Sequence, residues 1–152
     1  MLLTLNLKAM KRYIFTFFSI IMSLALMAQV SPETLAKRNK RKNLTVKEWN
    51  TNQSNKTRWL DNQRTYDDQG RKVEEIEYAS YGMKWRIVYQ YDDATGLLVR
   101  EIEYNDRNKP VIIRKYEYNT DGTKKKQYNY SPNGKLETIK VFEYIFSDAQ
   151  GQ

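Results

Sequence analysis

A tyrosine recurs along the chain at nearly constant spacing, and this repeat constrains the fold more than any other feature of the sequence. The intervals between the anchor tyrosines are 12, 13, 13, 14, 12 and 14 residues, for Tyr66, Tyr78, Tyr91, Tyr104, Tyr118, Tyr130 and Tyr144. Such an interval suits one β-strand followed by a tight turn. A degenerate copy has Trp49 in the anchor position, which brings the number of anchors to eight.

Turn sequences follow the anchors. Five of the six glycines lie four or five residues after an anchor, as Gly70 does after Tyr66 and Gly96 after Tyr91. Glycine is favoured where the backbone needs a positive φ. The unit after Tyr104 has no glycine and carries Asn108 at that place, the next most tolerant residue type for the left-handed region. We therefore expect a left-handed residue in each turn.

Between the turns lie strand-length segments rich in β-branched and aromatic residues, at 71–78, 84–91, 97–104, 109–118, 123–130 and 135–144. Apolar and polar residues alternate within them, as in a strand with one apolar face. Short turns make each strand antiparallel to the one before it. The sequence predicts an all-β fold: an antiparallel meander of about seven to eight strands, forming a coiled or folded open sheet or, alternatively, a small closed barrel.

Counting back from each anchor in steps of two places the aromatic side chains on one face of the sheet. Two interpretations of this face stay open: a ladder of cross-strand pairs that holds the sheet together, or a stacking platform for sugars and other flat ligands. The regular spacing favours the ladder. The candidate ligand-binding residues are Trp85, Tyr89, Tyr91, Tyr104, Tyr116, Tyr118, Tyr128 and Tyr130.

The repeating unit, Tyr-x-Tyr-Asp/Asn-x-x-Gly followed by a basic residue and a strand, resembles the YD-repeat (Rhs-type) family of bacterial β-hairpin repeats. The residues that carry the resemblance include 66–71, 89–96, 116–122 and 128–135. The resemblance implies a secreted or cell-surface protein in which the repeats form wrapped sheets and carry no chemistry themselves. The toxin-enclosing members have many more repeats and an effector domain, so the resemblance does not imply toxin delivery.

The N-terminal segment has the pattern of a secretory signal peptide. Lys11 and Arg12 precede an apolar run that ends near Met27, and cleavage after Ala28 is expected. Met10 is a possible alternative start. We expect three regions: a signal peptide at 1–28, a basic flexible linker at 29–43, and a single β-repeat domain at 44–152. No membrane span is expected after cleavage, and the expected location is the periplasm, the extracellular space or the cell surface.

Five positive charges fall within six residues of the expected linker: Lys37, Arg38, Lys40, Arg41 and Lys42. Such a cluster suits a solvated linker, or contact with an anionic envelope surface. Nucleic acid is not an expected partner of an exported chain.

The sequence contains no Cys and no His. This excludes disulfides, thiol or His-assisted nucleophiles and His-ligated zinc, and leaves paired carboxylates as the common catalytic chemistry. The adjacent acids Asp67-Asp68 and Asp92-Asp93 fit turn caps better than a catalytic pair or a calcium site, because they recur at one place in the repeat. We predict no catalytic residue, no metal site and no cofactor.

These observations favour a non-enzymatic exported β-repeat protein, acting as a binding or structural module in the bacterial cell envelope. The expected partner is an envelope protein or a glycan. The alternative is a small glycan-acting hydrolase, or a glycan-binding protein that uses the aromatic face; a hydrolase needs two carboxyl groups about 5 to 9.5 Å apart in one cleft.

Overall fold

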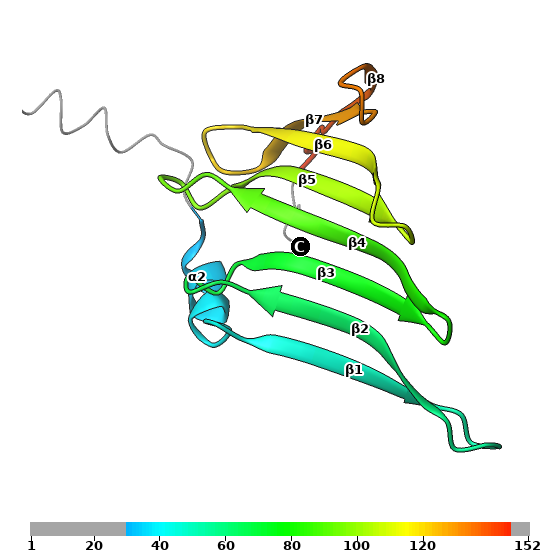
Figure 1. Ribbon diagram of the computed structural model, residues 1–152. Coiled ribbons are helices and arrows are strands. Elements are labelled where there is room, and N and C mark those ends of the chain that lie inside the picture. Colours follow the sequence, from blue (N-terminus) through cyan, green and yellow to red (C-terminus); the bar gives the residue numbers. More distant parts are fainter. Residues whose placement is uncertain (1–29, 147–152) are drawn as a thin grey trace, which may run out of the picture.

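The computed structural model describes residues 30–146, which form one eight-stranded antiparallel sheet and a short helix (Figure 1). The strands are paired in sequence order, which confirms the predicted meander. β1 and β8 are the two edges and do not pair with each other, so the sheet is open rather than closed. The strands are β1 (Thr45–Thr51), β2 (Arg58–Tyr66), β3 (Lys72–Ala79), β4 (Gly82–Tyr91), β5 (Leu98–Asn105), β6 (Pro110–Tyr118), β7 (Lys124–Tyr130) and β8 (Leu136–Val141).

The turns have the backbone conformation that the sequence predicts. Gly70 has a φ of 71°, and Asn108, the predicted substitute for glycine, has a φ of 57°. In the unit with Asn108, the side chain of Asn105 accepts hydrogen bonds from the backbone N–H groups of Arg107 and Lys109, both at 3.0 Å. Local turn chemistry therefore sets each reversal of the chain.

Every hairpin contains a β-bulge near the turn. The pairing skips one residue in the second strand of each hairpin, as at Val99 between the pairs Gln90–Arg100 and Tyr91–Leu98. A bulge inserts one extra residue opposite a regular strand and increases the local twist. The skipped residues are Asp61, Val73, Lys84, Val99, Val111, Lys125 and Glu137.

The bulges place successive anchors on opposite faces, so the prediction of a single aromatic face is wrong. Tyr91 pairs with Leu98 and shares its face, but the extra residue Val99 reverses the alternation, and Tyr104 pairs with Arg86 on the other face. We call the two sides the helix face and the open face. The helix face carries Tyr66, Trp85, Tyr89, Tyr91, Tyr116 and Tyr118, and the open face carries Tyr78, Tyr104, Tyr128 and Tyr130.

The sheet is a single layer, and its apolar side chains are only partly shielded. Tyr66 is the one buried hydrophobic residue among residues 30–146. All residues of β3 are half-buried, whereas all residues of β8 are exposed. Cross-strand side-chain pairs, rather than an enclosed core, therefore provide most of the contacts that hold the strands together.

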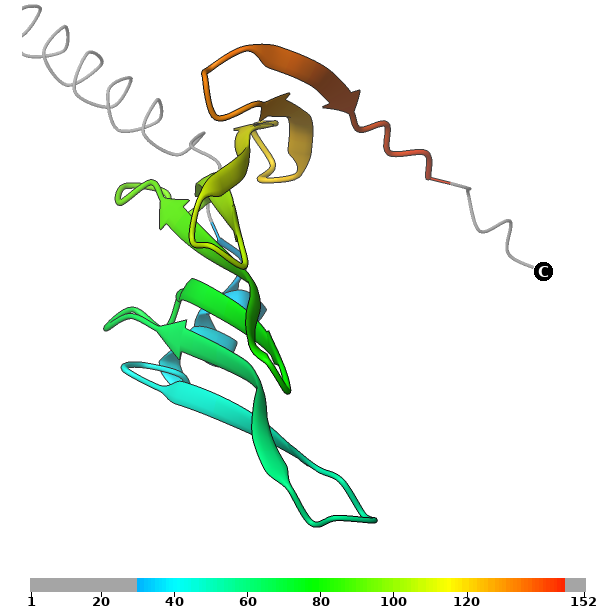
Figure 2. The ribbon, with the colours of Figure 1, turned by 45° about the vertical axis from the view of Figure 1, so that its right-hand side comes forward.

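The short helix α2 (Pro32–Asn39) lies against the helix face near the ends of β2 and β4 (Figures 1 and 2). Ser31 caps its first turn by accepting a hydrogen bond from the Thr34 N–H, and Pro32 occupies its start. Within the predicted flexible linker at 29–43, residues 32–39 form this helix, and two Arg side chains of the segment pack on sheet tyrosines. The predicted signal peptide at 1–28 lies outside the described residues. No helix of the described residues is both long and apolar enough to span a bilayer.

Candidate functional site

Four anchors form a ladder that repeats every second strand; we call Tyr66, Tyr91, Tyr118 and Tyr144 its rungs. Each hydroxyl from the second rung onward donates to the carbonyl oxygen of a residue at the start of an earlier strand. Tyr91 donates to Lys72 at 3.0 Å, Tyr118 to Leu98 at 2.7 Å and Tyr144 to Lys124 at 2.9 Å. The same bond thus ties three of the anchors, Tyr91, Tyr118 and Tyr144, to the sheet backbone.

Two arginines from the helix segment cover the first two rungs. The guanidinium carbon of Arg41 lies 5.4 Å from the ring centre of Tyr66, and that of Arg38 lies 5.6 Å from the ring of Tyr91. Arg71 also covers Tyr91, at 5.1 Å. These are cation–π distances, at which the electron-rich ring face attracts a positive charge.

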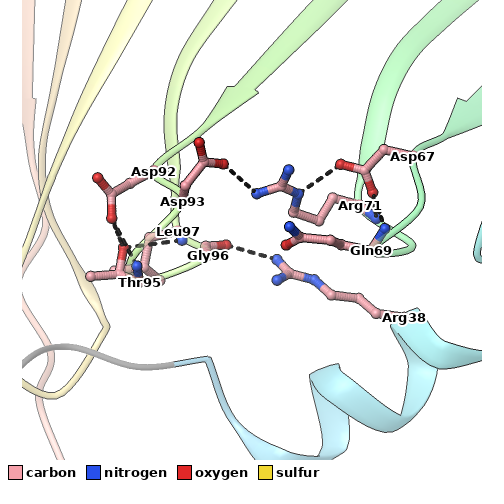
Figure 3. A network of polar contacts seen from close by, with 9 residues as sticks. All are labelled: Arg38, Asp67, Gln69, Arg71, Asp92, Asp93, Thr95, Gly96 and Leu97. Carbon is pink, nitrogen blue, oxygen red and sulfur yellow. Dashed lines mark hydrogen bonds and ion pairs between the residues drawn. The ribbon is translucent and has the colours of Figure 1, made fainter.

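A polar network ties α2 and two turns together (Figure 3). Arg71 donates from Nε to Asp67 at 2.7 Å and from Nη1 to Asp93 at 3.3 Å, which links the β2–β3 turn to the β4–β5 turn. Arg38 donates from Nη2 to the carbonyl oxygen of Gly96 at 3.0 Å. The side chain of Arg71 is 11% exposed, so solvent screens its pair with Asp67 weakly.

The close approach of α2 depends on Gly70. A Cβ atom added there would overlap the backbone carbonyl of Arg38. Burial raises the pKa of Asp67, but the hydrogen bonds and charge of Arg71 outweigh burial and hold that pKa below its ordinary value of 3.8. Asp67 therefore stays ionised and acts as an acceptor for Arg71 and for the turn.

In the middle of the helix face, Tyr89 contacts an ion pair of β3 that Lys72 and Glu75 form. Its hydroxyl donates to Glu75 at 3.0 Å, and Lys72 lies 4.6 Å from its ring centre while pairing with Glu75 at 2.6 Å. Burial, followed by the bond to Glu75, raises the pKa of Tyr89. Burial also raises the pKa of Glu75, yet the bonds from Lys72 and Tyr89 bring it below its ordinary value.

A second cluster of this kind lies between β5 and β6. Arg114 pairs with Glu103 at 2.6 Å and with Glu101 at 3.7 Å. Tyr116 lies beside them under Lys124, whose Nζ is 4.2 Å from the ring centre. The acids of these two clusters thus occur in ion pairs with neighbouring cations.

The remaining predicted aromatic residues lie on the open face. Arg86 covers Tyr104 at 4.3 Å, and Lys115 covers Tyr130 at 5.3 Å. Tyr128 donates to Glu117 at 2.8 Å. The structure therefore splits the predicted set into two groups, with Trp85, Tyr89, Tyr91, Tyr116 and Tyr118 on the helix face and the other three opposite.

The predicted basic cluster is also divided. Arg38 and Arg41 face the sheet, and Lys37 pairs with Glu33 at 2.7 Å within α2. Lys40 and Lys42 are exposed. The repeat pattern did not indicate Arg71 or α2 as parts of this site. Ser31 and Pro32 together give a helix-start signal that would have indicated α2.

The first acid of each adjacent pair, Asp67 and Asp92, caps its turn. Asp67 Oδ1 accepts from the backbone N–H groups of Gln69 and Arg71, at 3.0 and 2.8 Å. Asp92 Oδ1 accepts from the backbone N–H of Thr95 at 2.8 Å and from its hydroxyl at 2.7 Å. These bonds account for the recurrence of Asp at this place in the repeat.

The helix face is hollowed by grooves. A groove of about 350 Å³ lies between α2 and the third rung, with Tyr118, Leu98 and Asp121 among its lining residues. Another, of about 500 Å³, crosses β6, β7 and β8 and is lined mainly by polar side chains, including Arg114, Gln127, Asn129, Thr138 and Lys140.

No family model matches the chain, and no curated protein matches it. Among solved structures, the chain is similar to part of the GtfA/B complex bound to UDP and GlcNAc, with 18% sequence identity and a TM-score of 0.30. The match covers 62% of this chain and 19% of that one. At these values the similarity supports no transfer of function.

Proposed function

We propose that this chain is an exported, non-enzymatic β-repeat protein that acts as a binding or structural module in the bacterial cell envelope. The observation that carries the proposal is the single-layer sheet, whose two accessible faces carry many tyrosines paired with charged side chains. Some of these pairs recur at equivalent places, as Tyr89 with Lys72 and Tyr116 with Lys124 do. Such a surface suits an extended partner better than a small substrate in one enclosed pocket.

The lowered pKa values of three carboxyl groups support a role without catalysis. A general acid at neutral pH needs a carboxyl group with a raised pKa. Asp67, Glu75 and Glu117 have a lowered pKa, because each accepts hydrogen bonds from neighbouring cations or hydroxyls. These acids suit ion pairs and turn caps rather than proton transfer.

A glycan-acting protein is the second candidate, and the groove over β6 to β8 favours it. Its amides and cations, such as Asn129, Gln127 and Lys140, can donate hydrogen bonds to sugar hydroxyls or carboxylates. Glu101 and Glu103 lie beside this region, paired with Arg114.

Export and envelope binding can be tested with the full-length sequence expressed in a bacterial host. We expect the protein in the periplasm or medium with Gln29 as its first residue, and we expect it to sediment with purified cell-wall sacculi or envelope membranes. Retention in the cytoplasm would contradict export. Release of reducing sugars from sacculi, lost on Glu101→Gln, would show that the chain is instead a hydrolase.

A further inference from the structure

The third rung of the helix-face ladder lacks the cation that covers each of the first two. Arg41 covers Tyr66, and both Arg38 and Arg71 cover Tyr91. No cation of residues 30–146 lies over the ring of Tyr118, although its hydroxyl makes the same backbone bond as that of Tyr91.

Two local differences explain the missing cation. Arg71 follows Gly70 in the β2–β3 turn and reaches the ring of Tyr91 on β4. The residue at the same place in the β4–β5 turn, directly after Gly96, is Leu97, which carries no charge. On the α2 side, Arg38 lies over the ring of Tyr91 and donates a hydrogen bond to the carbonyl oxygen of Gly96. These contacts hold Arg38 at the second rung and not over Tyr118.

Two acids, Glu101 and Asp121, lie near the third rung. Burial raises the pKa of Tyr118 to about 12, and the charge of Glu101 adds to this rise. At Tyr91 burial also raises the pKa to about 12, but the charges of Arg38 and Arg71 oppose the rise. Asp121 stands exposed at the edge of the third rung, and hydrogen bonds from Thr123 lower its pKa, so it is ionised at neutral pH.

The space over this rung is open. The groove of about 350 Å³ between α2 and the β6–β7 turn is lined on the sheet side by residues that include Leu97, Leu98, Tyr118 and Asp121. Arg38 lines its α2 side, where its guanidinium is bound to the carbonyl oxygen of Gly96. An aromatic ring, an apolar wall and a carboxylate together suit a long cationic side chain, whose stem packs on the wall while its charge meets the ring and the acid.

We propose that the third rung binds an arginine side chain of a partner polypeptide, with the guanidinium over Tyr118 and beside Asp121. Arg38 on Tyr91 and Gly96 is the example of this contact within the chain itself. Tyr118 and Gly122 occupy the equivalent places two strands later. This inference deepens the proposed binding function, since it names the chemistry by which a protein partner is recognised.

The test is a titration of the isotope-labelled protein, secreted from its full-length sequence, with the peptide acetyl-Gly-Arg-Gly-amide. The matched probe replaces arginine by citrulline, which has nearly the same shape but no charge. We expect the backbone amide NMR signals of Gly122 and Thr123 to shift on binding. The citrulline peptide should bind about fivefold more weakly, since a cation–π contact with a nearby acid is lost.

Variants locate the site without removing the ring. Leu97→Arg should place a cation of the chain over Tyr118, as Arg71 is placed over Tyr91, and weaken arginine binding about fivefold. Val99→Arg adds the same charge two residues further along and is the control, with little expected change. Asp121→Asn should weaken binding about threefold while the fold, monitored by the remaining signals, is kept.

Equal binding of the two peptides, or shifts confined to the open face, would overturn the proposal. Shifts of the same amides that grow with protein concentration, without peptide, would assign the arginine to a second copy rather than to a partner. Sedimentation with sacculi or envelope membranes is measured separately, so a failure here leaves the test of the envelope function intact.

Discussion

The region around β2 to β4 and the last strands, β7 and β8, are built from the same hairpin repeat but differ in how well they are covered. Every residue of β3 is half-buried, and the segment with α2 lies over Tyr66 and Tyr91. Every residue of β8 is exposed, and Tyr144, which continues the ladder, is 47% exposed. The repeat determines the strands and turns of both regions. How far each tyrosine rung is shielded from solvent depends on which side chains pack against it.

The largest expected effect comes from removing one rung in each region. Tyr91→Ala removes a hydrogen bond to Lys72, two cation–π contacts and a large half-buried ring, and should cost about 3 kcal/mol of unfolding free energy. Tyr144→Ala removes the equivalent bond at an exposed place and should cost about 1 kcal/mol. Urea denaturation of both variants measures the difference. Equal losses would show that coverage does not matter.

Gly70→Ala tests the contact between α2 and the sheet. Gly70 and Gly134 both have a positive φ, so alanine costs about 1 to 2 kcal/mol at either place. At Gly70 alone the new Cβ overlaps the Arg38 carbonyl, and we expect a further loss of about 1 kcal/mol because α2 is displaced. Trypsin should then cut faster within 37–42. Similar protease sensitivity in Gly134→Ala would contradict this explanation.

The pH dependence of stability should differ between the two regions. The pKa of Asp67 is lowered in the folded protein, so its contribution is present above about pH 4 and is lost as the pH falls through the folded value. Asp67→Asn should cost about 1 kcal/mol at pH 7 and flatten the loss of stability below about pH 4. Glu117→Gln, in an exposed pair with Lys125, should change the acid dependence less. Melting temperatures between pH 2 and 7 test both.

The smallest effect is expected on the last strand. Ile139 is 50% exposed, so Ile139→Thr should change the unfolding free energy by less than about 0.5 kcal/mol. Ile76→Thr, at a half-buried place in β3 on the same face, should cost about 1 to 2 kcal/mol. A large loss for Ile139→Thr in denaturation would indicate that something covers β8 in solution.

The strands and turns followed from the sequence, because both depend on neighbouring residues. The glycines and Asn108 marked the left-handed positions of the turns, and the anchor spacing marked the strands. Because the turns are too short for a crossover connection, each strand pairs antiparallel with the next one. The meander could therefore be predicted from local chemistry alone.

The faces of the aromatic residues and the place of α2 were decided by the tertiary structure. One bulge residue, such as Val99, reverses the alternation, and the sequence pattern carries no sign of it, so Tyr104 came to lie opposite Tyr91. The helix segment is too short and too polar for its pattern to indicate burial, and its place follows from arginine contacts with residues far along the chain. Periodicity reports alternation within one strand; the register between strands and long-range contacts decide which side chains meet.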